Sequence, residues 1–264
     1  MVAEPAFAST VARHRIHIRD AVKRFDGRVV VSVDELVLGE RSIEGLIGPN
    51  GAGKTTLMRM VMHSIRLDRG AVTLRRPDRP DVILSSLPAH RMAGLGVVKS
   101  NQVVTDFQKL TILDSLMLAV AEAHYEQPQR ILAERSLFLR HEEEIRHHLR
   151  AFGFDDPTVF ARSAGEKKLL DIVRCLLLRP RFLLLDEPTA GLPDDVTAKV
   201  MAVVRDLAAS GTSVVIVEHD LDVIWNLCDW VHFMAEGDVV LRGDPRSIRA
   251  HHVVVEKYLG EGHV

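Results

Sequence analysis

The run of residues 48–56 constrains this chain more than any other feature, because its letters, GPNGAGKTT, match the phosphate-binding loop pattern GxxxxGK[ST] at every position. Such a loop points backbone N–H groups at phosphate oxygens, and glycines permit the dihedral angles and the close approach that this requires. The largely apolar segment 43–47 predicts a short buried strand before the loop, and residues 55–65 predict a helix whose N-terminus faces the anion. We therefore expect a nucleoside triphosphate site, with Lys54 on the β and γ phosphates and Thr55 on Mg²⁺. A glycine turn without chemical meaning is the alternative, and the flanking strand and helix disfavour it.

The charge balance, the cysteines and the lengths of the apolar runs limit what kind of partner and environment we expect for this chain. Of the 264 residues, 34 are Lys or Arg and 36 are Asp or Glu, so the formal charge of −2 gives a nucleic-acid partner no support and affinity for phosphate must be local. The two cysteines, Cys175 and Cys228, lack metal-ligand or redox spacing, which fits a reducing cytoplasm. No apolar run approaches the roughly 18 residues that span a bilayer, so we expect a soluble chain.

The apolar pattern predicts five segments along the chain. We expect a loose leader over residues 1–13, an antiparallel β layer with the phosphate-loop half of the core over 14–101, a helical subdomain over 102–165, the second half of the core over 166–242, and a helical tail over 243–264. In the second half, predicted strands at 182–185 and 213–217 alternate with predicted helices at 167–178, 194–208 and 221–228. Strict alternation of strand and helix predicts a parallel sheet that is covered on both faces.

The apolar strand at 182–185 ends in two acids, Asp186 and Glu187. A phosphate-loop ATPase needs a carboxylate at such a strand end for Mg²⁺, and Asp186 can supply it. Glu187 follows directly, so its side chain points elsewhere and could orient or deprotonate an attacking water. An acidic pair at a strand end is weak on its own, but together with the phosphate loop it indicates ATP hydrolysis.

The same residues carry a family resemblance. The segment 185–192, LDEPTAGL, resembles the Walker B segment and D-loop of ATP-binding cassette (ABC) ATPases, and the resemblance extends over about residues 16–260. Gln102 resembles the Q-loop glutamine, residues 163–166 (SAGE) the signature motif, and residues 217–220 (VEHD) the switch-histidine segment. The resemblance implies an α/β phosphate-loop NTPase cassette with a parallel RecA-like core sheet, an antiparallel β layer and a helical insertion.

The resemblance also implies a role for each motif residue. Catalysis would fall to Glu187, His219, Gln102 and Lys54, and Mg²⁺ would be held by Thr55, Gln102 and Asp186. His219 differs from the other histidines because it follows the strand at 213–217, at the carboxyl end of the sheet where ligands collect. The residues implied to contact ATP are Phe25, Asn50, Gly51, Ala52, Gly53, Lys54, Thr55, Thr56, Ser163, Gly165 and Glu166. Phe25 would stack on adenine, and a core aromatic is the alternative interpretation.

The signature departs from the family pattern LSGGQ. Ser163 and Gly165 keep a hydroxyl and backbone N–H groups at a helix N-terminus, which the family presents to the γ-phosphate bound by the opposite subunit. Arg162, Ala164 and Glu166 differ from the pattern, and a guanidinium at 162 must find water or a carboxylate. We hypothesise that this chain hydrolyses ATP in its own loop but offers a weaker signature to its partner, as in a heterodimer with unequal sites.

Three classes of function follow from the resemblance. The first, which we favour, is the ATP-hydrolysing subunit of a membrane transporter, where a second ABC ATPase subunit and transmembrane permease subunits complete the assembly at the inner face of the cell membrane. Its motifs resemble the branched-chain amino acid and urea uptake group, and the tail at 255–260 also resembles lipopolysaccharide-export ATPases. The second is a non-transport ABC ATPase. The third is a nucleotide-binding module without turnover, which Glu187 and His219 disfavour.

Overall fold

An antiparallel sheet forms one layer of the molecule in the computed structural model, which describes residues 12–100, 110–124, 134–159 and 163–259. The strand order is β2-β1-β4-β5. In β1, Ile16 and Ile18 are buried whereas Arg15 and Arg19 are exposed, so one face of the sheet packs on the core. The four strands are β1 (Arg15–Phe25), β2 (Arg28–Leu38), β4 (Arg69–Arg76) and β5 (Arg79–Ile83).

The central sheet has the order β10-β9-β3-β8-β7-β6, and all neighbouring strands are parallel except β9 and β10. Its strands are β3 (Ile43–Ile47), β6 (Val97–Lys99), β7 (Phe182–Asp186), β8 (Ser213–Val217), β9 (Trp230–Ala235) and β10 (Asp238–Gly243). Strands β3, β7 and β8 are buried along their whole length, as parallel strands with two covered faces must be. Because these three strands are parallel, the loops after them meet at one edge of the sheet.

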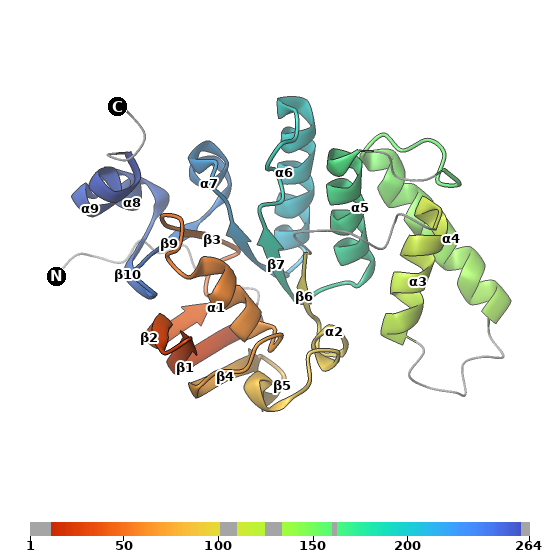
Figure 1. The fold of residues 1–264 in the computed structure, drawn as a ribbon. Helices are drawn as coiled ribbons and strands as arrows, with labels where there is room; N and C mark the ends of the chain where they lie inside the picture. Colours follow the sequence, from red (N-terminus) through yellow and green to blue (C-terminus); the bar gives the residue numbers. More distant parts are fainter. Residues whose placement is uncertain (1–11, 101–109, 125–133, 160–162, 260–264) are drawn as a thin grey trace.

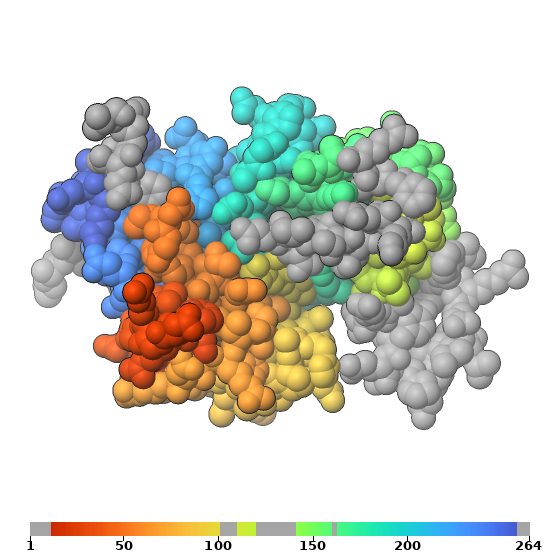
Figure 2. Space-filling view, viewed as in Figure 1, coloured from red at the N-terminus to blue at the C-terminus, as the bar shows by residue number. Residues whose placement is uncertain are grey.

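Helices cover the central sheet, and two apolar cores fill its faces. Leu183 and Leu185 of β7 enter one core, whereas Phe182 and Leu184 enter the other, which the antiparallel sheet closes. Helices α3 and α4 lie with α5 at the end of the molecule opposite the antiparallel sheet (Figures 1 and 2). Within the described ranges, no helix combines the length and apolar character needed to cross a membrane. The α-helices are α1 (Lys54–Val61), α2 (Arg91–Gly94), α3 (Ile112–His124), α4 (Glu134–Ala151), α5 (Ala164–Leu177), α6 (Asp194–Ala209), α7 (Leu221–Leu227), α8 (Pro245–Ala250) and α9 (His252–Val254). The other two helical segments are the 3₁₀ turn η1 (Leu84–Ser86) and the π-helical segment η4 (Val255–Leu259).

Most predicted elements lie where the sequence pattern put them. The strands predicted at 43–47 and 213–217 coincide with β3 and β8. The helix predicted at 55–65 ends early, at Val61, because His63 adopts a left-handed φ of 48° and its N–H bonds to the Met60 carbonyl. Strands β6, β9 and β10 were not predicted, and they extend the central sheet at both edges.

Candidate nucleotide site

The loop between β3 and α1 has the conformation that its glycines were expected to allow. A Cβ atom added to Gly48 would lie 2.0 Å from the Met234 carbonyl oxygen of β9, so only glycine fits there. Gly53 stands at the N-cap of α1 with a left-handed φ of 102° and offers no side-chain cap. The first N–H groups of α1 are therefore available to an anion.

Lys54 occupies the interior of this loop. The residue is 6% exposed, and Nζ donates hydrogen bonds to the carbonyl oxygens of Gly48 (2.6 Å) and Pro49 (3.0 Å). Burial lowers the pKa of the Lys54 ammonium, whereas the charges of Glu187 and Asp186 act in the opposite direction. The loop lysine and the two acids predicted to act with it thus lie within electrostatic range of one another.

Asp186 ends β7 in a buried position. Its N–H donates to Ser100 Oγ (2.9 Å), and its Oδ2 atom lies 2.9 Å from Lys99 Nζ. Its other oxygen, Oδ1, is buried and has no hydrogen-bond partner among the described residues. Thr55, in the first turn of α1, is exposed. A buried carboxylate oxygen without a partner is the kind of donor that a hard divalent cation takes.

Glu187 and His219 form a pair at the carboxyl ends of β7 and β8. Nε2 of His219 lies 3.0 Å from Oε1 of Glu187. Glu187 has a left-handed φ of 50°, which costs a non-glycine residue about 1–3 kcal/mol, and its N–H donates to the Val217 carbonyl (2.8 Å). A strained glutamate that contacts a histidine beside a phosphate loop is well placed to hold a water against a phosphoryl group.

Glu218, which directly precedes His219, was not among the site residues predicted from the sequence. It is 1% exposed, and its Oε1 atom accepts hydrogen bonds from the N–H (2.7 Å) and the hydroxyl (2.6 Å) of Thr189. Burial raises the pKa of Glu218, although these hydrogen bonds oppose the effect. Glu218 therefore ties the loop after β8 to the loop after β7. An acid directly after an apolar strand was the available signal, but acids at strand ends are common in turns.

The predicted signature residues stand at the N-terminus of α5. Ser163 caps the helix, because its Oγ accepts from the Glu166 N–H (3.0 Å), and the Glu166 carboxylate accepts in return from the Ser163 N–H (3.0 Å). Gly165 packs toward the loop after β7, since a Cβ added to it would lie 3.3 Å from Leu192 Cδ2. The helix N-terminus thus carries a carboxylate of its own.

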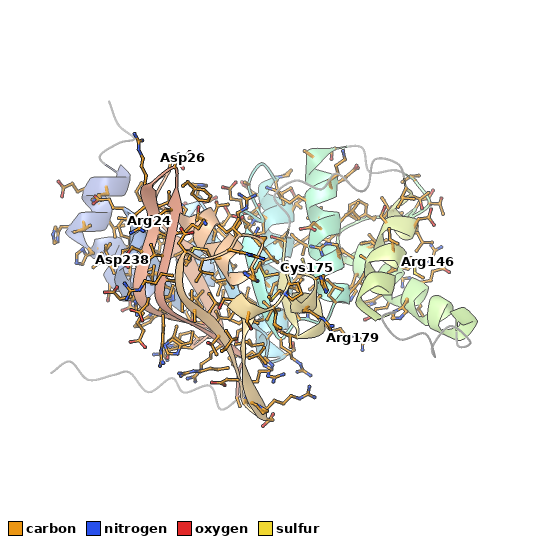
Figure 3. The ribbon with its side chains drawn as sticks, turned by 60° about the horizontal axis from the view of Figure 1, so that its bottom comes forward. Arg24, Asp26, Arg146, Cys175, Arg179 and Asp238 are labelled. Atoms are coloured by element: carbon orange, nitrogen blue, oxygen red, sulfur yellow. The ribbon has the colours of Figure 1, made fainter. Side chains whose placement is uncertain are left out.

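Phe25 lies at the β1–β2 hairpin turn, whose two central residues, Asp26 and Gly27, are both left-handed. The residue is 43% exposed, and Lys23 Nζ lies 5.3 Å from the ring centroid. An exposed ring disfavours the core-aromatic alternative. Figure 3 shows Asp26 at the end of this hairpin, far from Arg146 in the helical part of the molecule.

Strand β2 of the same hairpin reaches the phosphate loop. The Ser32 N–H bonds to the Gly237 carbonyl (2.9 Å), and the Gly237 N–H bonds to the Ala52 carbonyl (3.1 Å). These two hydrogen bonds join the hairpin, the β9–β10 turn and the phosphate loop into one unit, which suits a platform for the base of a nucleotide.

Comparison with known proteins identifies the family. The sequence profile of the ABC transporter family matches residues 34–190, which is more than half of the chain. The chain belongs to the ABC transporter family. The predicted resemblance is thereby confirmed, and with it the assignment of this ABC protein as an ATPase and as the ATP-binding subunit type of a transporter.

Two curated relatives of this ABC protein belong to different transport systems. The lipopolysaccharide export system ATP-binding protein LptB of Haemophilus influenzae is 32% identical over 239 residues, which cover 90% of this chain and 94% of LptB. The high-affinity branched-chain amino acid transport ATP-binding protein LivG of Salmonella typhimurium is 30% identical over 252 residues, which cover 92% of this chain and 97% of LivG. ATPases of branched-chain amino acid transport and of lipopolysaccharide export, both named by the motif resemblance, are therefore among its relatives.

Solved structures confirm the predicted cassette fold. A nucleotide-free ATP-binding cassette from an ABC transporter matches with a TM-score of 0.76 at 22% identity and covers 93% of this chain and 98% of the solved chain. A dimeric cassette in a post-hydrolysis state with ADP and phosphate matches with a TM-score of 0.70 at 17% identity and covers 88% and 99%.

Two residues of the sequence-based site of this ABC protein lie outside the described residues. Gln102, predicted to contact Mg²⁺, is one, and Arg162 of the altered signature is the other. The remaining predicted residues gather around the loops after β3, β7 and β8, apart from Phe25 on the hairpin and the signature residues on α5. Their individual roles stay predictions.

Proposed function

We propose that this chain hydrolyses ATP to ADP and phosphate at the site formed by the phosphate loop, Asp186, Glu187 and His219. The observation that carries the proposal is the 3.0 Å contact between Glu187 Oε1 and His219 Nε2, at the sheet edge where Lys54 also lies. A module that only bound nucleotide would not need a strained glutamate beside a histidine, and so this contact favours turnover.

The residues divide the chemistry among themselves. Loop residues Asn50 to Thr56 would cradle the phosphates through backbone N–H groups, and the Lys54 ammonium would donate to the β and γ oxygens. The Glu187 carboxylate accepts a proton from water while the water oxygen bonds to the γ-phosphorus and the bond from that phosphorus to ADP breaks. His219 holds Glu187 and faces the γ-phosphate. Phe25 would stack on the adenine ring.

The donor set fits Mg²⁺. Asp186 offers a buried, unpartnered carboxylate oxygen, and Thr55 offers an exposed hydroxyl in the first turn of α1. These two residues would hold the ion together with Gln102. When bound, Mg²⁺ neutralises charge on the β- and γ-phosphate oxygens.

The site is proposed to be shared between two subunits. Ser163 and Gly165 at the N-terminus of α5, with Glu166, would serve the nucleotide of the opposite subunit. The carboxylate of Glu166 in the capping box supports the hypothesis of a weaker signature, because it brings negative charge to the place where a γ-phosphate would arrive.

The assembly is proposed to sit at the inner face of the cell membrane, where permease subunits would carry the cargo. We favour uptake of branched-chain amino acids or urea, because LivG is similar to this chain over 97% of its own length. Export of lipopolysaccharide is the second candidate, because LptB is similar over 94% of its length. Isolation of the complex from native membranes, followed by transport assays with radiolabelled leucine and urea, decides between them.

Hydrolysis is tested by comparing the assembled complex carrying Glu187→Gln with wild type. We expect the ATPase rate to fall at least 100-fold while nucleotide binding persists, as the loss of a general base of this kind predicts. Glu35→Gln, on the antiparallel sheet, is the control and should hydrolyse ATP like wild type. Equal rates for Glu187→Gln and wild type would remove Glu187 from its proposed role.

A further inference from the structure

Lys168 makes two contacts that the sequence did not predict. It lies on α5, five positions after the capping residue Ser163. Its Nζ atom donates hydrogen bonds to the main-chain carbonyl oxygens of Glu187 (2.8 Å) and Ala190 (2.7 Å). One ammonium group thus holds both ends of a four-residue stretch that begins at the proposed general base.

This stretch leaves β7 and reaches regular structure again only at α6, so its shape depends on contacts from other elements. The Glu187 N–H bonds to the Val217 carbonyl, and Glu218 binds the Thr189 N–H and hydroxyl. Lys168 binds from the α5 side. A residue at a left-handed φ keeps that conformation only where its surroundings over-determine it, and the backbone N–H and carbonyl of Glu187 are both held.

The same helix touches this loop a second time, closer to its N-terminus. Gly165 leaves room for Leu192, whose Cδ2 atom would lie 3.3 Å from an added Cβ. A shift of α5 along or across its axis would therefore move the carbonyl of Glu187 through Lys168 and the side chain of Leu192 through Gly165. Helix α5 is therefore joined at two places to the loop that begins at the proposed general base.

We propose that Lys168 is a positioning residue that sets the orientation of Glu187 and couples it to the position of α5. The inference rests on the proposed function, since α5 carries the residues proposed to serve the opposite nucleotide. Engagement of Ser163 with that nucleotide would then reach the hydrolytic carboxylate of its own subunit through Lys168. Lys168 touches neither nucleotide in this scheme and acts through the backbone of Glu187.

If Lys168 served only to stabilise the fold, its replacement would mainly lower the free energy of unfolding, whereas the structure predicts little loss of stability. The Ala190 carbonyl is exposed, so water can replace the ammonium there, and α5 keeps its apolar face when Lys168 is lost. Lys168→Met retains the length of the side chain and removes the three donors. We expect the chain to fold normally and the geometry of Glu187 to relax.

The test compares Lys168→Met with Lys168→Arg and with Lys167→Met, the matched control on the same helix. In the assembled complex, Lys168→Met should lower kcat at least tenfold and leave KM and the Kd for ATP within twofold of wild type. Lys168→Arg should restore most of kcat, because a guanidinium can also donate to two carbonyls. Lys167→Met should behave like wild type.

Hydrogen exchange gives a readout that does not depend on turnover. In Lys168→Met, amide exchange over residues 187–192 should accelerate at least fivefold while exchange over α1 stays unchanged. Unchanged exchange over 187–192, an unchanged kcat, or equal losses in Lys167→Met would each overturn the proposal. If wild type fails to hydrolyse ATP or equals Glu187→Gln, the proposed function fails instead, and the exchange result still decides the role of Lys168.

Discussion

The Nζ atom of Lys99 lies 2.9 Å from the Oδ2 atom of Asp186, so the carboxylate proposed to hold Mg²⁺ is already paired with a cation from the chain itself. The Asp186 side chain is 1% exposed, and that of Lys99 is 17% exposed. Breaking a buried ion pair by removing one partner leaves an uncompensated charge, which is strongly destabilising. Lys99 should therefore stabilise the fold of the nucleotide-free protein.

Replacement of Lys99 by methionine should lower the free energy of unfolding by about 3 kcal/mol in the absence of nucleotide and divalent cation. Mg²⁺ with ADP should recover part of this loss, because the ion supplies positive charge to the same carboxylate. The stabilisation by Mg·ADP should thus be larger in Lys99→Met than in wild type. Urea unfolding with and without Mg·ADP measures both quantities.

The control for this change is Arg146→Met. Arg146 pairs with Glu142 at 2.8 Å on α4, where their side chains are 42% and 24% exposed and such ion pairs contribute about 0–1 kcal/mol. A loss of similar size in both variants, or an equal response of Lys99→Met and wild type to Mg·ADP, would contradict the pairing as the cause.

Replacement by alanine should lower the free energy of unfolding by different amounts at two glycines of the phosphate loop. At Gly48 an added Cβ would lie 2.0 Å from the Met234 carbonyl oxygen, so the loop or β9 must move, whereas no atom lies within 4 Å of a Cβ at Gly51. Gly51→Ala should cost about 1 kcal/mol, because its φ of 78° disfavours a side chain, and Gly48→Ala should cost several kcal/mol. Urea unfolding of both variants is the measurement, and similar losses would exclude the clash.

The sequence predicted the site well wherever a local pattern carries the chemistry. The loop at Lys54 lies in a continuous motif, and the apolar strands before it and before Asp186 are buried as their composition requires. Parallel strands then bring their carboxyl ends to one edge, and so Glu187 and His219 meet although 32 positions separate them. Local pattern and sheet topology are sufficient for these residues.

The side chains that hold the site were not predictable in the same way. Lys168, Glu218 and Lys99 are polar residues within or beside apolar segments, and such residues usually face solvent. Their partners are chosen by packing between elements: Lys168 reaches a backbone carbonyl 19 positions away, and Lys99 reaches a carboxylate 87 positions away. Strands β9 and β10 also escaped prediction, although the Glu236-Gly237 pair between two apolar runs is a usable hairpin signal.

The buried acid Glu218 should give stability a specific dependence on pH. Burial raises the pKa of Glu218 in the folded chain. Between the pKa of this group in the unfolded chain and its raised pKa in the folded chain, the folded chain binds more protons. The free energy of unfolding therefore falls as the pH rises through that interval. The positive charge of Lys168 acts on this carboxylate and opposes the rise in its pKa. Thr189 and the backbone N–H of His219 donate hydrogen bonds to it. Glutamine keeps an acceptor for Thr189 but does not titrate.

We therefore expect the unfolding free energy of Glu218→Gln, minus that of wild type, to increase from about pH 4 upward and then to level off. The increase amounts to about 1.4 kcal/mol for each unit by which folding raises the pKa. Urea unfolding over a pH series measures it. Glu35→Gln is the control with the opposite sign, because a hydrogen bond to His17 lowers the pKa of Glu35. If the unfolding free energy of Glu218→Gln minus that of wild type stays constant or falls as the pH rises, the raised pKa of Glu218 is contradicted.

The carboxylate of Glu166 should weaken the use of α5 by the opposite subunit. It accepts a hydrogen bond from the Ser163 N–H at the helix N-terminus, where a charge interacts with the helix dipole by up to about 1 kcal/mol. Glu166→Gln keeps an oxygen for this bond and removes the negative charge. The affinity of ATP-driven dimerisation should rise about fivefold, as measured by analytical ultracentrifugation with Mg·ATP in the Glu187→Gln background. Glu166→Ala, which also loses the cap, should gain less. A dimer that is equally or less stable in Glu166→Gln would exclude charge repulsion at this helix.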